Sequence, residues 1–143
     1  MNDEYYMRQA LAEAKRAGAK DEVPIGAVIV HGEQIIAKAH NLTETLHDVT
    51  AHAEMQAITM AADYLGGKYL AECALYVTVE PCVMCAGALG WSQIGRVVFG
   101  TNDEKRGYTR FAPNALHPRT KIVSGVMEQE CRQLMQEFFR QKR

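Results

Sequence analysis

Hydrophobic residues recur at helical spacing near both ends of the chain. A first stripe predicts an amphipathic helix over Glu4–Ala17, and consists of Tyr6, Met7, Ala10, Leu11 and Ala14. A second stripe predicts a C-terminal helix, and consists of Met127, Cys131, Leu134, Met135, Phe138 and Phe139. We expect both stripes to face a core, because burial of one apolar face stabilises a helix of a globular domain.

Shorter apolar runs between these helices predict β-strands. Ala27–Val30 and Gln34–Ala39 are separated by a short segment that contains a glycine, which indicates a β-hairpin. Leu75–Val79 is a run of strand length and is typical of a strand buried on both faces. Val97–Phe99 and Ile122–Ser124 are two further short strands.

Two more helices are predicted between the strands. Thr50 is placed to cap a helix over Ala51–Leu65, and Gly66 then ends that helix. Pro81 is well tolerated where a helix starts, so the next helix is expected over Cys82–Trp91. The alternation of helices and strands indicates a three-layer α/β domain with helices packed on a mixed sheet. The pattern leaves the strand order open.

The chain is expected to be one domain, residues 1–143, because no repeat or linker divides it. With 143 residues, of which 48% are hydrophobic, it can form a proper core. Since no apolar run approaches the about 18 residues of a membrane span, we expect no membrane partner. The acidic N-terminus lacks the features of a signal peptide, so we expect a cytoplasmic protein with reduced thiols.

Charge is divided unevenly along the chain. Residues 1–95 carry six basic and twelve acidic side chains, a net charge of −6, whereas residues 96–143 carry ten basic and five acidic ones, a net charge of +5. The basic half could meet a phosphate-rich partner. A solvated basic loop and tail would give the same distribution, and charge alone does not separate the two interpretations.

One set of residues carries recognisable chemistry. His52 is followed by Pro81-Cys82-Val83-Met84-Cys85, which supplies one imidazole and two thiols as zinc ligands. A structural zinc site closes with four protein ligands, whereas a catalytic site leaves one position for water. Glu54, two residues beyond His52, is expected beside the metal, where it can move protons. Both ligand segments lie at predicted helix starts, where the helix dipole favours thiolates.

Other arrangements of the cysteines have to be weighed. Cys82 and Cys85 could form a redox pair, or half of a four-ligand zinc site that Cys73 or Cys131 completes. Cys131 falls on the apolar stripe of the last predicted helix, which indicates a buried small hydrophobe. Cys73 has no cysteine near it in the sequence. The spacing therefore favours three ligands with an open position.

His-x-Glu followed by Pro-Cys-x-x-Cys is the signature of the zinc-dependent nucleobase deaminases. More closely, the chain resembles the bacterial tRNA-specific adenosine deaminases along nearly its whole length. The matching stretches are Val23–Val28, Thr50–Glu54, Tyr76–Ala88 and Ile94–Gly100, with Gly125-Val126, Glu130-Cys131 and Phe138-Phe139 near the end. This resemblance implies a cytidine-deaminase-like α/β fold, three layers α/β/α with a central mixed five-stranded sheet.

The resemblance also implies a function. His52, Cys82 and Cys85 would bind one Zn²⁺ per subunit, and Glu54 would shuttle protons while zinc-bound hydroxide attacks purine C6 and ammonia leaves. The product would be inosine at the wobble position, position 34, of a tRNA anticodon. A homodimer is expected, with Trp91 as a packing or dimer-contact residue rather than a base stacker.

Two polar residues match family positions around the substrate. Asn41 corresponds to an asparagine that helps to hold the target nucleoside, although a turn residue after a strand explains it equally well. Asp103 corresponds to a position near the RNA backbone, and without the family it would be taken for a solvated loop acid.

After Gly107 the chain departs from the family pattern. The segment Tyr108–Lys121 contains two aromatic residues and lies among basic ones, so we expect stacking on splayed bases and contacts with phosphates. The residues concerned are Tyr108 and Phe111 together with Arg106, Arg110, Arg119 and Lys121. Packing of the aromatic side chains on the core or on another subunit is the competing interpretation.

Two other functions share the same signature. A deaminase of a free base or nucleoside, of guanine or cytosine type, would use the same ligands without needing the basic excess after residue 95. A zinc-stabilised binding protein would leave Glu54 without a chemical task.

Overall fold

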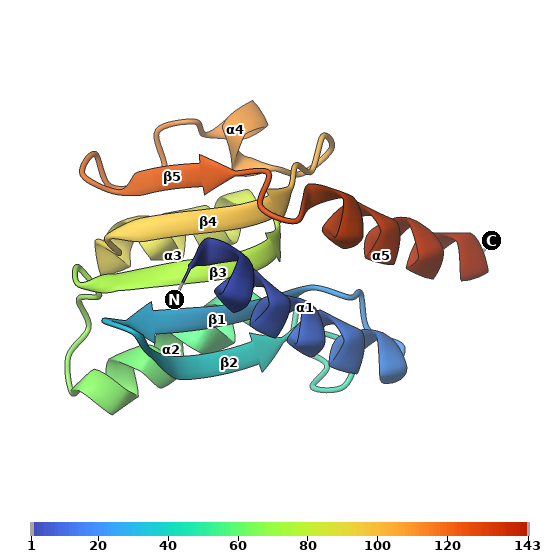
Figure 1. Ribbon diagram of the computed structural model, residues 1–143, viewed down its shortest axis with the longest axis horizontal. Coiled ribbons are helices and arrows are strands. Elements are labelled where there is room, and N and C mark those ends of the chain that lie inside the picture. The colour runs from blue at the N-terminus through green and yellow to red at the C-terminus, as the bar shows by residue number, and fades with distance from the viewer. Residues whose placement is uncertain (1, 143) are drawn as a thin grey trace.

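The computed structural model describes residues 2–142 as alternating helices and strands (Figure 1). In chain order the elements are α1 (Asp3–Ala19), β1 (Gly26–His31), β2 (Gln34–His40), α2 (Ala53–Leu65), β3 (Cys73–Val79), α3 (Val83–Ser92), β4 (Arg96–Thr101), α4 (Tyr108–Phe111), β5 (Lys121–Ser124) and α5 (Glu128–Gln141). Every strand and long helix predicted from the sequence is present, and α4 is an additional short helix.

The strands form one mixed five-stranded sheet with the order β2-β1-β3-β4-β5. β1 pairs antiparallel with both β2 and β3, whereas β3, β4 and β5 run parallel to one another. The hairpin and the mixed sheet are therefore confirmed. The strand order, in which β3 lies between β1 and β4, is known only from the structure, because local sequence patterns do not determine it.

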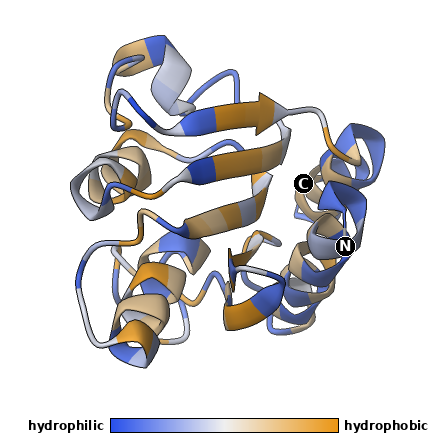
Figure 2. Ribbon diagram, turned by 60° about the vertical axis from the view of Figure 1, so that its left-hand side comes forward, coloured by the Kyte–Doolittle hydropathy of each residue, from blue (hydrophilic) through white to orange (hydrophobic). Residues whose placement is uncertain are grey.

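Helices cover both faces of this sheet. α1 and α5 lie on one face, and α2 and α3 lie on the other (Figures 1 and 2). The apolar residues of β3 supply both interfaces, because Leu75 and Val77 join the cluster under α2 and α3, while Tyr76 joins the cluster under α1 and α5. The three-layer α/β/α arrangement is thus confirmed, with β3 buried on both faces as its sequence predicts.

Two predicted helix starts are corrected. α2 begins at Ala53, and His52 rather than Thr50 is its N-cap residue, because the Thr50 hydroxyl donates to the carboxylate of Asp48 instead. α3 begins at Val83, and Cys82 is its N-cap residue. The predicted end of α2 is confirmed by Gly66, which adopts a left-handed conformation with φ of 72°.

The topology brings the loops that follow β2, β3 and β4 to the end of the sheet at which these strands finish, here called the carboxyl-end edge. β2, β3 and β4 run in the same direction, so the segments that follow His40, Val79 and Thr101 all leave from that edge. α2 and α3 begin there as well. Ligand sites of open α/β sheets lie outside the carboxyl ends of the strands, and this edge is therefore where the site is expected.

Among residues 2–142, none of the helices combines the length and the apolar character that crossing a bilayer requires.

Candidate metal centre and active site

His52, Cys82 and Cys85 meet at the carboxyl-end edge of the sheet. Their ligand atoms all lie within 4.8 Å of one another. The Nδ1 atom of His52 is 3.6 Å from the Sγ atom of Cys82 and 3.5 Å from the Sγ atom of Cys85. It is thus Nδ1, and not Nε2, that faces the two sulfurs.

These separations match a tetrahedral ion. Ligands bound at about 2.0–2.3 Å from one tetrahedral zinc ion are about 3.5 Å apart. Cys73, in β3, and Cys131, on the buried side of α5 at the other face of the sheet, are free thiols outside this group. Within residues 2–142 the group therefore contains three candidate protein ligands, the number that the spacing predicts for a site with one open position.

Two helix N-termini point at the group. His52 and Cys82 are the N-cap residues of α2 and α3, and Cys85 lies in the first turn of α3. A hydrogen bond from the Cys85 thiol, together with the His52 imidazole, lowers the pKa of Cys82 to about 4, and donation to Cys82 raises the pKa of Cys85. A bound divalent cation would supply the charge that stabilises both thiolates.

Glu54 lies beside the ligands rather than among them. Its side chain is 3% exposed and contacts the thiol of Cys85, but it does not belong to the group of ligand atoms. Burial raises the pKa of Glu54 to about 7, the range in which a carboxyl group exchanges protons readily near neutral pH. The arrangement places a buried carboxyl group next to a candidate metal position.

Two buried carboxylates at the same edge were missed by sequence analysis. Glu22 accepts hydrogen bonds from the backbone N–H groups of Glu44 and Thr45 and from the Thr45 hydroxyl. Glu80 does the same for Asp103 and Thr109. A single acidic residue without a basic residue at helical spacing gives no sequence pattern that predicts its burial. For Glu80, the one signal in the sequence is its position directly before Pro81-Cys82.

The candidate substrate residues Asn41, Asp103 and Arg106 differ in burial. Asn41 is buried directly after β2, and its N–H donates to the carbonyl of Ile25. Asp103, whose carboxylate accepts from the N–H groups of Lys105 and Arg106, caps its own loop. The Arg106 side chain is exposed in that loop.

The two aromatic residues after Gly107 differ sharply in solvent exposure. Phe111 is 57% exposed, next to the exposed Arg110, whose guanidinium lies over the Phe111 ring. Tyr108 is 1% exposed and packs in the core under α2 and α3, so its ring offers no free face to a base. For Tyr108 the packing interpretation holds, and the expectation of stacking does not match this structure.

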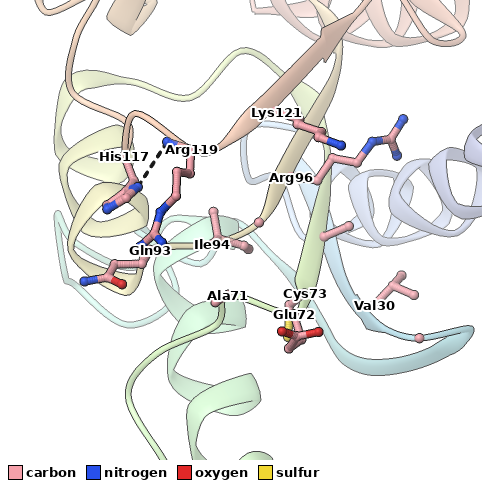
Figure 3. A pocket seen from close by; sticks show the side chains of 13 residues that line it. Val30, Ala71, Glu72, Cys73, Gln93, Ile94, Arg96, His117, Arg119 and Lys121 are labelled. Atoms are coloured by element: carbon pink, nitrogen blue, oxygen red, sulfur yellow. Dashed lines mark hydrogen bonds between the residues drawn. The ribbon is translucent and has the colours of Figure 1, made fainter.

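The basic side chains of residues 96–143 do not form one surface. Arg119 and Lys121 lie near the start of β4, at the opposite edge from the metal ligands, where they line a pocket of about 550 Å³ (Figure 3). Arg96 lines the same pocket and pairs with Asp3. Because none of the three candidate ligands lines this pocket, it is separate from the candidate active site.

The chain is similar to known deaminases in both sequence and structure. A family model described as MafB19-like deaminase matches residues 1–143. The tRNA-specific adenosine deaminase of Bacillus subtilis is 48% identical over 99% of this chain and 91% of its own length. That of Agrobacterium fabrum is 43% identical, with 97% of this chain and 95% of the relative covered.

This chain belongs to the tRNA-specific adenosine deaminase family. Among solved structures, one from structural studies of A-to-I editing by tRNA:A34 deaminases is 42% identical and superposes with a TM-score of 0.85, covering 91% of this chain and 98% of that one. NE0047 in complex with 8-azaguanine, at 22% identity and a TM-score of 0.87, covers 96% of this chain and 84% of its own, and shares the fold with the family.

Proposed function

We propose that this protein hydrolyses adenosine to inosine at the wobble position of a tRNA anticodon. The observation that carries the proposal is the three-atom group of His52, Cys82 and Cys85 with the buried Glu54 beside it, in a chain whose full-length relatives are tRNA-specific adenosine deaminases. We further propose that residues 1–143 act as one domain and that the reaction takes place in the cytoplasm.

We propose that the three ligands hold one zinc ion per subunit, since two sulfurs and an imidazole form a donor set typical of zinc. When bound, zinc supplies Lewis-acid activation of the attacking water. Glu54 then takes a proton from the water that attacks purine C6 and delivers it to the departing amino group, so that ammonia leaves. Burial suits this carboxyl group to the task, because it keeps bulk water away from the proton path.

Binding of the RNA is assigned to the loops around the metal centre. Asn41, at the end of β2, is proposed to hold the target nucleoside. Arg106, Arg110 and Phe111 are exposed beyond β4, where cationic and aromatic groups can contact phosphates and a splayed base. Asp103 is proposed to contribute through the shape of its loop, because its carboxylate is already occupied by backbone N–H groups.

We propose that the protein is a homodimer. Trp91, at the end of α3, is 86% exposed, and α2 presents other exposed apolar side chains, Met60, Tyr64 and Leu65. Burial of such side chains is a main source of stability in permanent interfaces.

Deamination of a free purine is the second candidate, because NE0047 and a guanine deaminase of Bacillus subtilis are structural neighbours. The test is incubation of the metal-loaded protein with an anticodon stem-loop bearing a wobble adenosine, with the same stem-loop bearing guanosine there, and with free adenine, guanine and cytosine. Inosine and ammonia from the first substrate alone are expected. Ammonia released only from a free base would contradict the RNA substrate.

A further inference from the structure

Glu80 is a buried residue whose carboxylate, within residues 2–142, accepts hydrogen bonds only from the segment that follows β4. Residues 102–109, which we term the rim segment, follow β4 and include the first two residues of α4. The Oε1 atom of Glu80 accepts from Asn102 Nδ2 at 3.3 Å and from the Asp103 N–H at 3.1 Å. The Oε2 atom accepts from the Thr109 N–H at 3.1 Å and from the Thr109 hydroxyl at 2.6 Å. All four donors are neutral groups of the rim segment.

The same carboxylate is covalently next to the metal-ligand segment. Glu80 is followed by Pro81 and Cys82, and the rim segment also touches these two residues through its backbone. The Tyr108 N–H donates to the Pro81 carbonyl at 2.9 Å, and Gly107 forms an isolated antiparallel bridge with Cys82. The rim segment is therefore held against Pro81 and the candidate metal ligand Cys82 near its end, and its first two residues and its last residue are held against Glu80.

Gly107 shows how closely the two segments approach. A Cβ atom at this position would lie 2.4 Å from the Cδ and Oε2 atoms of Glu80, closer than any real contact. The backbone of the rim segment thus packs directly on the carboxylate, without an intervening side chain. A contact of this kind transmits a displacement of one segment to the other.

We propose that Glu80 is a positioning residue, which sets the place of the rim segment relative to the metal ligands and so the place of Arg106 and of the α4 residues that follow. This inference rests on the proposed function, in which Arg106, Arg110 and Phe111 contact RNA. Glu22 uses the same design at the same edge, because its carboxylate accepts from the N–H and the hydroxyl of Thr45 in the loop before His52.

The decisive variants are Glu80→Gln and the pair Thr109→Val and Thr109→Ser. A carboxamide has one acceptor oxygen, so in either orientation its NH₂ group faces a backbone N–H of the rim segment, that of Asp103 or that of Thr109, which cannot accept a hydrogen bond. Thr109→Val removes only the hydroxyl donor, whereas Thr109→Ser keeps it. Asp3→Asn is the matched control, because the Asp3 carboxylate also accepts several hydrogen bonds, from Tyr76 and Arg96, but at the opposite edge of the sheet.

The first measurement is steady-state deamination of an anticodon stem-loop by metal-loaded full-length variants, with bound zinc counted. For Glu80→Gln and Thr109→Val we expect unchanged zinc and a KM raised on the order of tenfold, since misplacement of a binding group by about 1 Å can cost up to 10²-fold. Thr109→Ser and Asp3→Asn should keep the KM of the wild type. Loss of zinc in Glu80→Gln, or a lower kcat with unchanged KM, would overturn the proposal.

The second measurement does not depend on activity. Hydrogen–deuterium exchange should be faster in Glu80→Gln at the amide of Asp103 or at that of Thr109, because these amides donate to different oxygens of Glu80 in the wild type and the carboxamide keeps only one oxygen. Unchanged exchange at both amides would refute the positioning role even if the enzyme were active. A wild-type protein that leaves the stem-loop unmodified would instead refute the proposed function, and the exchange data would still decide the role of Glu80.

Discussion

His52 and Cys85, separated by 33 positions in the chain, bring their Nδ1 and Sγ atoms to within 3.5 Å of each other. We predict that Cys82→Ser and Cys85→Ser bind little zinc after dialysis, because the remaining two ligands do not hold the ion. Cys73→Ser, which changes a buried thiol of β3 outside the group, should retain one zinc per chain. The measurement is metal analysis of the purified variants. Zinc loss in Cys73→Ser to the same extent would contradict the assignment.

Glu54→Gln separates metal binding from turnover. The carboxamide has the size of the carboxyl group but cannot carry the proton, so we predict that kcat falls by about 10²–10⁴-fold while zinc content and fold remain. Ammonia release and circular dichroism measure the two properties. An active Glu54→Gln protein would refute the assigned role.

The Glu22 hydrogen bonds make a prediction about acid stability. The carboxylate is buried, which by itself raises its pKa, but the hydrogen bonds from Thr45 and Glu44 outweigh burial, and the pKa of Glu22 is lowered in the folded protein. Its contribution to stability is therefore present above its ordinary pKa of 4.5 and is lost as pH falls through the lower, folded value.

We accordingly expect Glu22→Gln to lower the free energy of unfolding at pH 7 by about 1–3 kcal/mol. The difference from the wild type should shrink as pH falls below 4.5, the ordinary value for this carboxyl group. Urea denaturation at a series of pH values measures it. Glu44→Gln is the control, because Glu44 donates to Glu22 through its backbone N–H and this substitution leaves that donor in place. A difference that stays constant into acid would contradict the interpretation.

Two arginines test which surface meets the RNA. Arg106 lies in the rim segment, whereas Arg119 lines the pocket at the opposite edge of the sheet. We predict that Arg106→Gln reduces the slope of log K against log salt for an anticodon stem-loop by about 0.7, as expected for one lost phosphate contact with a single strand. Arg119→Gln should leave the slope unchanged. Equal effects of the two substitutions would contradict a binding surface confined to the metal edge.

Trp91→Arg is expected to dissociate the proposed homodimer, because a charge would replace a large apolar side chain in the interface. Phe139→Arg changes another exposed aromatic residue, on α5 at the opposite face of the sheet, and should leave the mass in solution unchanged. Sedimentation equilibrium measures both. A monomeric wild type would refute the dimer itself.

The elements of the fold were predictable where periodicity is strong. The run Leu75–Val79 identifies a strand buried on both faces, and the stripe on α1 identifies its buried face. The position of β3 between β1 and β4 was not predictable, because that pairing joins segments far apart in sequence. Helix starts were displaced by one or two residues, since the Thr50 hydroxyl has a closer acceptor in Asp48.

The candidate site was predictable to the extent that residue type defines chemistry. His52 and the two cysteines could be recognised as candidate ligands because few side chains bind zinc, and in the structure their ligand atoms lie within 4.8 Å of one another. Burial of Tyr108 could not be predicted, because one aromatic residue in a loop has no periodicity that distinguishes core from surface. The separation of Arg119 from Arg106 depends on the register of β5 against β4, which the local sequence does not encode.

The spacing of the ligands also has a consequence for the lifetime of the folded state. An ion held by His52 and Cys82 is a cross-link across 30 residues, and it joins the first turns of two helices. In the chain-entropy description, a covalent cross-link that closes a loop of this size stabilises a protein by about 3–4 kcal/mol. A bound ion would therefore act as a reversible cross-link that stabilises the folded protein, in addition to its role in catalysis. A chelator should accordingly shorten the half-life of this protein under proteolysis.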